Sequence, residues 1–472
     1  MTRTPAPPIN AQTLWAPQAW INGAWQPHVL MRIGRDGHFT DISPHVSAPP
    51  HATVLPGPVL PGLVNAHSHA FQRAFAGLAE QRTAGHDDFW GWRSRMYGVA
   101  LRITPEQLEA VATQLYGELL QGGYTQVCEF HYLQHAPDGS RYADPLTMSL
   151  PLLRAAQATG IGLTLLPVLY QRAGFTQPAL RDDQRRFATT VAEVLALRDA
   201  VRALGDAMIR AGVAIHSLRA ADAAAITELT RAVADDDAPI HIHIAEQTGE
   251  VDDCLAATGK RPIEWLAEHV ALDARWQLVH ATHATPAEIG AVGRSGAGIV
   301  LCPSTEANLG DGLCDLPAWL QTQVQPSLGS DSQVGRQWPA ELKLLEYGQR
   351  LRLRQRNVAA APQRGFPSTA AALFTHSLAG GAAAAGFQTW GLVAGARADC
   401  LVLDMAVPGL LGLAPALALD ACVFATERPP FAQVWVAGRL CLVQGQVPQA
   451  RAHAGAFVAA MTALGATDQR QA

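Results

Sequence analysis

The segment Pro61-Gly62-Leu63-Val64-Asn65-Ala66-His67-Ser68-His69 contains the strongest structural signal of the chain. Residues 63–66 are expected to form a short strand that leads directly into the two histidines. Side chains alternate along a strand, so His67 and His69 project to the same side. Two imidazoles placed in this way can hold one Zn²⁺ ion at roughly 2.0–2.1 Å. Packed or surface histidines are the alternative interpretation of this pattern when it is taken by itself.

Seven further apolar runs follow, with alanine- and leucine-rich helical patterns between most of them. Such alternation predicts a parallel sheet, and eight repeats predict closure into a (β/α)₈ barrel of the TIM type. We therefore expect an α/β fold whose active-site residues lie at the carboxyl ends of the strands. The seven runs are residues 126–130, 163–168, 211–215, 240–244, 277–279, 298–301 and 325–329.

Both ends of the chain show short strand patterns with turns between them. Asn22-Gly23 and Asp36-Gly37 are hairpin signals between apolar runs. Strand patterns return after about residue 396, at 398–404 and 433–438. We expect residues 1–60 and 397–472 to form a small β-sandwich domain beside a metal-dependent barrel of residues 61–396.

Other chemically active side chains also occur where predicted barrel strands end. His243 ends one strand and Glu246 follows it, while His280 and Asp331 end two later strands. Barrel enzymes place their chemistry at these ends, so the repeated position favours a metal site over packed histidines. The expected ligands are His67, His69, His243 and Asp331.

Three neutral imidazoles and one carboxylate suit one zinc ion per chain, with a position left for water; another divalent ion would also fit. The ion lowers the pKa of the bound water, and Asp331 is expected to take its proton. His280 is expected to orient the hydroxide or polarise the substrate. Glu246 is expected to shuttle protons to a leaving nitrogen.

The composition excludes several classes of protein. Hydrophobic residues make up 49% and charged residues 16%, which is typical of a globular chain. The net charge of −5 gives no basic surface, so neither nucleic acid nor an anionic membrane is expected as a partner. The seven scattered cysteines and the lack of a signal peptide or long apolar stretch favour a cytoplasmic protein. We expect a homodimer, the commonest assembly of soluble enzymes.

The segment from Pro61 to His69 resembles the amidohydrolase superfamily, as does Gly391–Asp399, and the resemblance covers nearly the whole chain. A narrower similarity is to the formimidoylglutamate deiminases (N-formimino-L-glutamate iminohydrolases). It implies zinc-dependent hydrolysis of N-formimino-L-glutamate to N-formyl-L-glutamate and ammonia, a step of histidine degradation. The motifs that carry it are residues 67–74, 77–80, 89–93, 129–132, 216–219, 241–247, 279–283 and 302–312.

The same resemblance implies which residues hold the substrate. They are Gln72, Arg93, Tyr132, His216 and Arg219. A planar guanidinium binds a carboxylate through two parallel hydrogen bonds. The implied substrate has two carboxylates, so Arg93 and Arg219 are expected to bind one each. Ordinary surface arginines are the alternative in a chain so rich in arginine.

Two details of the sequence refine this picture. Two-metal barrels of this class commonly bridge their ions with a carboxylated lysine, but the only lysines are Lys260, in a predicted loop, and Lys343, in a predicted helix. A single metal is therefore expected, which favours deamination. The family usually carries a histidine where this chain has Gln333. We expect the ligand set to be unaffected and a neighbouring contact to differ.

Two other functions remain open on sequence grounds. A deaminase of a purine or pyrimidine ring would use the same metal residues, but it would need an aromatic slot instead of two arginines. A non-catalytic scaffold on a degenerate barrel would typically have lost ligands, and here the four ligands, Glu246 and His280 are all present.

Overall fold

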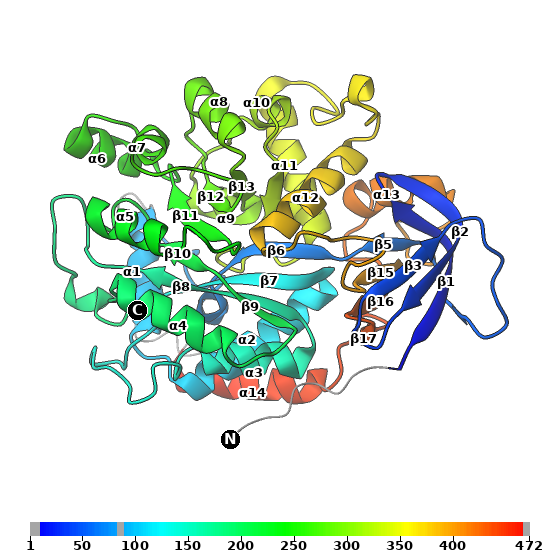
Figure 1. Cartoon of the computed structure of the whole chain (residues 1–472), viewed down its shortest axis with the longest axis horizontal. Coiled ribbons are helices and arrows are strands. Elements are labelled where there is room, and N and C mark those ends of the chain that lie inside the picture. The colour runs from blue at the N-terminus through cyan, green and yellow to red at the C-terminus, as the bar shows by residue number, and fades with distance from the viewer. Residues whose placement is uncertain (1–9, 83–88, 466–472) are drawn as a thin grey trace.

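The computed structural model describes residues 10–82 and 89–465, and a closed parallel barrel forms its centre (Figure 1). All eight apolar runs expected from the sequence form strands of this barrel, and each strand pairs with the next around the ring. Their order is β6 (Leu63–Ser68), β7 (Tyr124–His131), β8 (Gly162–Leu169), β10 (Val213–Ile215), β11 (Ile240–Ile244), β12 (Trp276–His280), β13 (Gly298–Leu301) and β14 (Pro326–Leu328).

The fourth position of the ring is a broken strand. A short strand, β9 (Ile209–Ala211), pairs with the first half of β8, and β10 pairs with its end and closes the ring. Gly212 separates the two pieces. A β-carbon at Gly212 would lie 2.4 Å from the carbonyl oxygen of Pro239, so the close approach of the neighbouring chain requires glycine.

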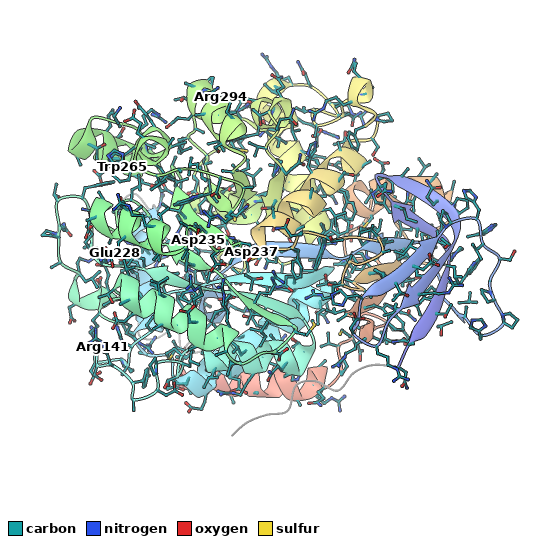
Figure 2. The ribbon with its side chains drawn as sticks, viewed as in Figure 1. Arg141, Glu228, Asp235, Asp237, Trp265 and Arg294 are labelled. Atoms are coloured by element: carbon teal, nitrogen blue, oxygen red, sulfur yellow. The ribbon has the colours of Figure 1, made fainter. Side chains whose placement is uncertain are left out.

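Helices surround the barrel and cover its outer surface (Figure 1). Several begin with a capping box in which a threonine and a residue three positions later satisfy free backbone N–H groups, as at Thr104, Thr190 and Thr285. Charged side chains of both signs, such as Arg141, Glu228 and Arg294, are exposed on the outer helices and loops (Figure 2). No helix in the described ranges is both long and apolar enough to span a bilayer. The helices are α1 (Phe89–Ala100), α2 (Pro105–Gln121), α3 (Leu150–Thr159), α4 (Val191–Arg202), α5 (Ala223–Ala232), α6 (Thr248–Thr258), α7 (Pro262–His269), α8 (Pro286–Ser295), α9 (Pro303–Leu309), α10 (Leu316–Gln321), α11 (Trp338–Leu353), α12 (Thr369–Ala384), α13 (Ala418–Phe424) and α14 (Ala450–Ala463).

The two ends of the chain meet in a separate mixed sheet beside the barrel, as expected (Figure 1). Its hydrogen bonds run through seven strands in one path, and the short β4 is attached to β1. The turns at Asn22-Gly23 and Gly37 connect neighbouring antiparallel strands. The sheet has its own apolar core, formed by residues such as Leu14, Met31 and Val402. The strands are β1 (Gln12–Ile21), β2 (Ala24–Ile33), β3 (Phe39–Ser43), β4 (Thr53–Val54), β5 (Val59–Pro61), β15 (Cys400–Leu403), β16 (Phe431–Val436) and β17 (Arg439–Val443).

The junction between the sheet and the barrel is short and polar. β5 lies in the small sheet, Gly62 follows, and β6 opens the barrel. Arg397 and Asp399 form a buried ion pair with a 2.6 Å N–O separation, and Arg397 also donates to Gln126 on β7. Downstream of the sheet, α14 packs against α2, so the C-terminal segment also contacts the barrel.

Candidate metal centre and active site

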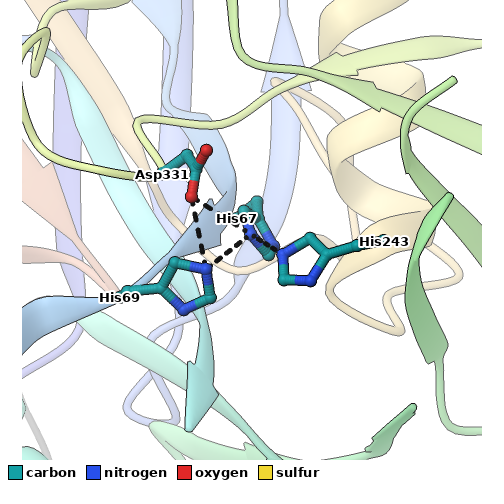
Figure 3. A group of neighbouring side chains, drawn as sticks. All are labelled: His67, His69, His243 and Asp331. Carbon is teal, nitrogen blue, oxygen red and sulfur yellow. Dashed lines mark hydrogen bonds and ion pairs between the residues drawn. The ribbon is translucent and has the colours of Figure 1, made fainter. Parts of the chain in front are cut away.

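Four side chains from three separate parts of the barrel converge at one point (Figure 3). His67 and His69 lie at the end of β6, His243 lies on β11 across the ring, and Asp331 follows β14. The Nε2 atom of His67 is 2.9 Å from Nε2 of His243 and 3.1 Å from Nε2 of His69. Oδ1 of Asp331 is 3.2 Å from Nε2 of His69. These are the four ligands expected from the sequence.

Hydrogen bonds on the far side of two rings fix which nitrogen faces the centre. Nδ1 of His69 donates to the carbonyl of Phe130 at 2.9 Å, and Nδ1 of His243 donates to the carbonyl of His216 at 2.9 Å. The Nε2 atoms of neutral His69 and His243 therefore carry lone pairs, which point at the same spot. Lone pairs this close repel one another unless a cation lies between them. Nitrogen ligands of one zinc ion are separated by roughly 3 to 3.5 Å, so the cluster fits a single ion.

The charge states expected of the cluster also suit a cation. Burial lowers the pKa of His67 to about 3 and holds the pKa of His243 well below its usual range. Burial acts to raise the pKa of Asp331, but the adjacent imidazoles of His67 and His69 outweigh it and place that pKa well below normal. Neutral imidazoles around an ionised carboxylate are metal ligands in the form that binds.

Gly329 allows the loop that carries Asp331 to approach β6. A β-carbon at this position would lie 2.7 Å from Cβ of His67 and 2.8 Å from Sγ of Cys302. The backbone N–H of Asp331 then donates to the carbonyl of His67 at 3.0 Å. Ligands of two neighbouring strands are thus brought together by direct backbone contact.

Glu246 and His280 lie beside the metal cluster. Nε2 of His280 is 3.7 Å from Oε1 of Glu246 and 3.8 Å from Oδ2 of Asp331. The opposite nitrogen, Nδ1, is 3.3 Å from Oε1 of Glu306 on α9. His280 and Asp331 both have left-handed backbone conformations, with φ of 70° and 45°. Non-glycine residues in this region are uncommon and cluster at functional sites.

One cavity connects the metal cluster with every residue that the resemblance implied for substrate binding. Its volume is about 610 Å³ when the open mouth is counted. The five expected substrate-binding residues are not all in contact with one another. Two of them are hydrogen-bonded, since Nε2 of Gln72 donates to the hydroxyl of Tyr132 at 3.0 Å. The residues that line the cavity include Gln72, Arg93, Tyr132, His216 and Arg219, together with His69, His243, Glu246, His280 and Asp331.

Arg93 and Arg219 bring two guanidinium groups to this cavity. Burial lowers the pKa of the Arg93 guanidinium, and the nearby charge of Arg219 contributes in the same direction. The pKa of His216 is held well below its usual value by burial and by Arg219. Two guanidiniums that line one cavity indicate a site for an anion.

The sequence interpretation missed three acidic groups. Glu250 lines the cavity, and its Oε2 accepts from the backbone N–H of Glu246 at 3.1 Å. Glu306 contacts His280, and Asp311 lies close enough to Glu246 and His280 to share an ion with them. Glu306 and Asp311 belong to the motif 302–312, while Glu250 follows Glu246 by four residues. Nothing in the spacing of these three acidic residues along the sequence distinguishes them from acidic residues that have no role in a site.

Residues assigned no role in the chemistry lie elsewhere. His241, two positions before His243 on β11, is fully buried, and its Nε2 bonds to the carbonyl of Ala384 at 2.9 Å. Lys260 forms ion pairs with Glu264 and Glu268. Lys343 donates to the carbonyl of Thr426. Neither lysine lines the cavity.

Comparison with known proteins agrees with the resemblance found in the sequence. Residues 59–441 match the amidohydrolase family. The chain belongs to the amidohydrolase family. The formimidoylglutamate deiminase of Pseudomonas aeruginosa is 46% identical to this amidohydrolase over 446 residues, which cover 94% of this chain and 98% of that protein. The narrower resemblance seen in the sequence is therefore confirmed.

Solved structures agree with the fold of this amidohydrolase. A crystal structure of an amidohydrolase from Brucella melitensis superposes with a TM-score of 0.91 at 40% identity, covering 96% of this chain and 99% of that one. An adenosine deaminase from Xanthomonas campestris, solved with bound zinc, has a TM-score of 0.78 at 21% identity, covering 98% of this chain and 100% of that one. The second likeness is one of fold alone.

Proposed function

We propose that this amidohydrolase hydrolyses N-formimino-L-glutamate to N-formyl-L-glutamate and ammonia, with one zinc ion per chain. The observation that carries the proposal is that Arg93 and Arg219 line the cavity that holds the metal cluster. A dicarboxylate substrate needs two such groups, and a guanidinium recognises a carboxylate through two parallel hydrogen bonds. The relative from Pseudomonas aeruginosa, which carries the name of this activity, supports the same substrate.

Zinc is the ion that the donor set favours. A set of three imidazoles and one carboxylate binds zinc in preference to calcium or magnesium, because those two ions bind mainly oxygen ligands. When bound, zinc lowers the pKa of a coordinated water toward neutrality. The ligands are His67, His69, His243 and Asp331.

The residues around the ion supply the proton transfers. In the reaction, the oxygen of water bonds to the formimino carbon, the bond from that carbon to the terminal nitrogen breaks, and the nitrogen leaves as ammonia. Asp331 takes a proton from the attacking water. Glu246 delivers two protons in turn to the nitrogen, one as water adds to the carbon and one as the carbon–nitrogen bond breaks, so both protons of the water end in the ammonia. Both carboxylates face Nε2 of His280, which holds the nucleophile by donating a hydrogen bond.

Substrate contacts are assigned to the rest of the cavity. Arg93 and Arg219 each bind one carboxylate. Gln72 and Tyr132, already hydrogen-bonded to each other, contact the formimino end together with His216. His216 remains neutral because burial keeps its pKa low, so it acts as a hydrogen-bonding group without adding charge.

Deamination of a purine or pyrimidine ring is the second candidate. The specific observation in its favour is an aromatic wall in the same cavity, which includes Trp92, Tyr97, Tyr132, Tyr170 and Phe187. Binding of a neutral ring would not need the two arginines in that cavity. The complete ligand set argues against the third candidate, a scaffold without catalytic activity.

The deciding experiment measures ammonia release by the purified, zinc-loaded protein from N-formimino-L-glutamate, guanine, cytosine and adenosine. We expect rapid release from the first compound alone, with N-formyl-L-glutamate as co-product. Release from a nucleobase or nucleoside alone would overturn the proposed substrate and the roles of both arginines. Protein that cannot hold stoichiometric metal would instead favour the scaffold.

We also propose a homodimer. Leu344, Tyr347 and Leu351 on α11 are exposed apolar side chains, and Leu351 is 81% exposed. A measured mass of two chains in solution would support this assembly, and a mass of one chain would refute it.

A further inference from the structure

Strands β6 and β14 carry ligands of the same ion, but little regular pairing joins them. Their ladder contains the single pair Leu328 and Asn65, followed by an isolated bridge between Ser68 and Asp331. Backbone hydrogen bonds of Asp331 with His67 and His69 form this bridge. Side-chain contacts beyond the strands add to them in setting the distance between the histidines of β6 and the carboxylate of Asp331.

A continuous chain of buried hydrogen bonds supplies these contacts. Nδ2 of Asn65 donates to Oγ of Ser330 at 2.7 Å, and Oγ of Ser330 donates to Oε1 of Gln333 at 2.8 Å. Nε2 of Gln333 donates to Oγ of Ser68 at 3.0 Å, and Oγ of Ser68 donates to Oε2 of Glu129 at 2.8 Å. Each hydroxyl accepts one bond and donates the next, so the chain runs in one direction from the amide of Asn65 to the carboxylate of Glu129.

Gln333 is the member that connects the two strands. Its second Nε2–H donates to the carbonyl of Asp331 at 2.7 Å, and the same carbonyl accepts from the backbone N–H of His69 at 3.2 Å. One fully buried amide thus contacts the peptide of Asp331 and also Ser68, the residue between His67 and His69. Both N–H groups of this amide and its carbonyl oxygen are engaged in hydrogen bonds.

The backbone around Gln333 depends on these bonds. Asp331 and Gln333 both have left-handed conformations, with φ of 45° and 68°. Such conformations persist in non-glycine residues only where the surroundings hold them. Arg336 also donates to the carbonyl of Gln333, and through Glu118 it is connected to Arg73, which follows β6.

We propose that Gln333 is a positioning residue for the metal centre: its side-chain amide sets the placement of Asp331 relative to His67 and His69. The amide does so from behind the ligands and does not contact the substrate cavity. A glutamine suits this position because it accepts one hydrogen bond and donates two. A neutral histidine has at most one donor nitrogen and one acceptor nitrogen, so it could not reproduce all three contacts.

The proposal shares with the proposed function the role of Asp331 as a ligand, but its test needs no substrate. Gln333→Met keeps the approximate volume and removes all three hydrogen bonds, while Gln333→Glu keeps only the acceptor. The matched control is Gln349→Met. Gln349, on α11, is also fully buried, but it donates to the carbonyl of Cys314 and does not contact the ligands.

Zinc affinity is measured by competition with a chromophoric chelator, and the visible spectrum of the cobalt(II)-loaded protein reports ligand geometry. We expect both Gln333 variants to bind zinc about 10- to 100-fold more weakly, the usual effect of losing a group that orients ligands. Their cobalt spectra should differ from the parent, while those of Gln349→Met should not. Zinc affinity and a cobalt spectrum in Gln333→Met that match those of Gln349→Met would overturn the proposal.

A second variant keeps the test decisive if Gln333→Met does not fold. Ser68→Ala removes the acceptor on β6 and leaves Gln333 in place. We expect weaker zinc binding again, and unchanged binding would overturn the proposal. Loss of formiminoglutamate activity with unchanged zinc affinity would count against the positioning role, whereas weak zinc binding in these variants would support it even if the parent enzyme proved to act on another substrate.

Discussion

Nε2 of His280 lies 3.7 Å from Oε1 of Glu246, and the two side chains alter each other's protonation. Burial lowers the pKa of His280, but the charge of Glu246, the hydrogen bond to Glu306 and the charge of Asp331 outweigh it, so the net shift is upward. Burial also raises the pKa of Glu246, against the opposing charge of His280. A protonated imidazole beside a carboxyl of raised pKa is suited to donating a hydrogen bond and passing on a proton.

The first prediction follows from this pair. Glu246→Gln keeps the shape of the side chain but cannot carry a proton to the leaving nitrogen. We expect kcat to fall by about 10²- to 10⁴-fold with little change in zinc content, because Glu246 is not one of the four ligands. Steady-state kinetics and metal analysis check this, and a variant that keeps a tenth of the parent kcat would contradict the role.

The second prediction compares two histidines on one strand. His243→Ala should lose stoichiometric zinc and nearly all activity, because a ligand is removed from the cluster. His241→Ala should retain zinc, since its ring bonds to the carbonyl of Ala384 and lies behind the site. Metal content per folded chain measures both. Equal zinc retention in the two variants would exclude His243 as a ligand.

The third prediction concerns the carboxylates of the substrate. Arg93→Gln and Arg219→Gln should each raise KM for N-formimino-L-glutamate by about 10- to 150-fold, the equivalent of about 1.5–3 kcal/mol for a charged hydrogen bond. Arg294→Gln, on the exposed surface of α8, serves as the control. Unchanged KM in both cavity variants would show that the arginines do not bind the substrate.

The fourth prediction is a pH dependence of stability. Burial raises the pKa of Glu341 from 4.5 to about 7. Between these values the native state holds a proton that the unfolded state has lost, so this group makes the free energy of unfolding fall as pH rises from about 4.5 to 7. Glu341→Gln has no ionisable group at this position and so removes this fall in the free energy of unfolding. Ser304 can still donate its backbone N–H to the side-chain carbonyl of the new amide.

Urea unfolding of both proteins at several pH values checks this linkage. The stability of the variant relative to the parent should increase by up to about 3 kcal/mol between pH 5 and pH 8. A difference that stays constant with pH would contradict a raised pKa at Glu341.

The fifth prediction concerns the junction of the sheet and the barrel. Asp399→Ala leaves the charge of Arg397 buried without its partner and should lower the free energy of unfolding by about 3–5 kcal/mol. Asp41→Ala breaks the exposed pair with Arg32 and should cost about 0–1 kcal/mol. Denaturant titration measures both. Equal losses would show that the buried pair has no special role.

The sequence by itself determined the barrel and most of its chemical groups. Apolar runs alternating with helical patterns predicted all eight strands, because a strand buried on both faces has to be apolar throughout. An inward-facing side chain at the carboxyl end of a barrel strand points into the mouth. The positions of His67, His69, His243 and Asp331 at strand ends were therefore enough to predict one cluster.

The tertiary structure alone decided which surrounding groups contact that cluster. Glu306 reaches His280 from a helix after the next strand, and Gln333 reaches Ser68 from a neighbouring strand's loop. Neither contact can be recognised from a repeating pattern in the sequence. Both depend on left-handed turns and on the close approach that Gly329 permits. Strand ends follow from local pattern, whereas the groups that orient the ligands are set by how separate strands are placed against one another.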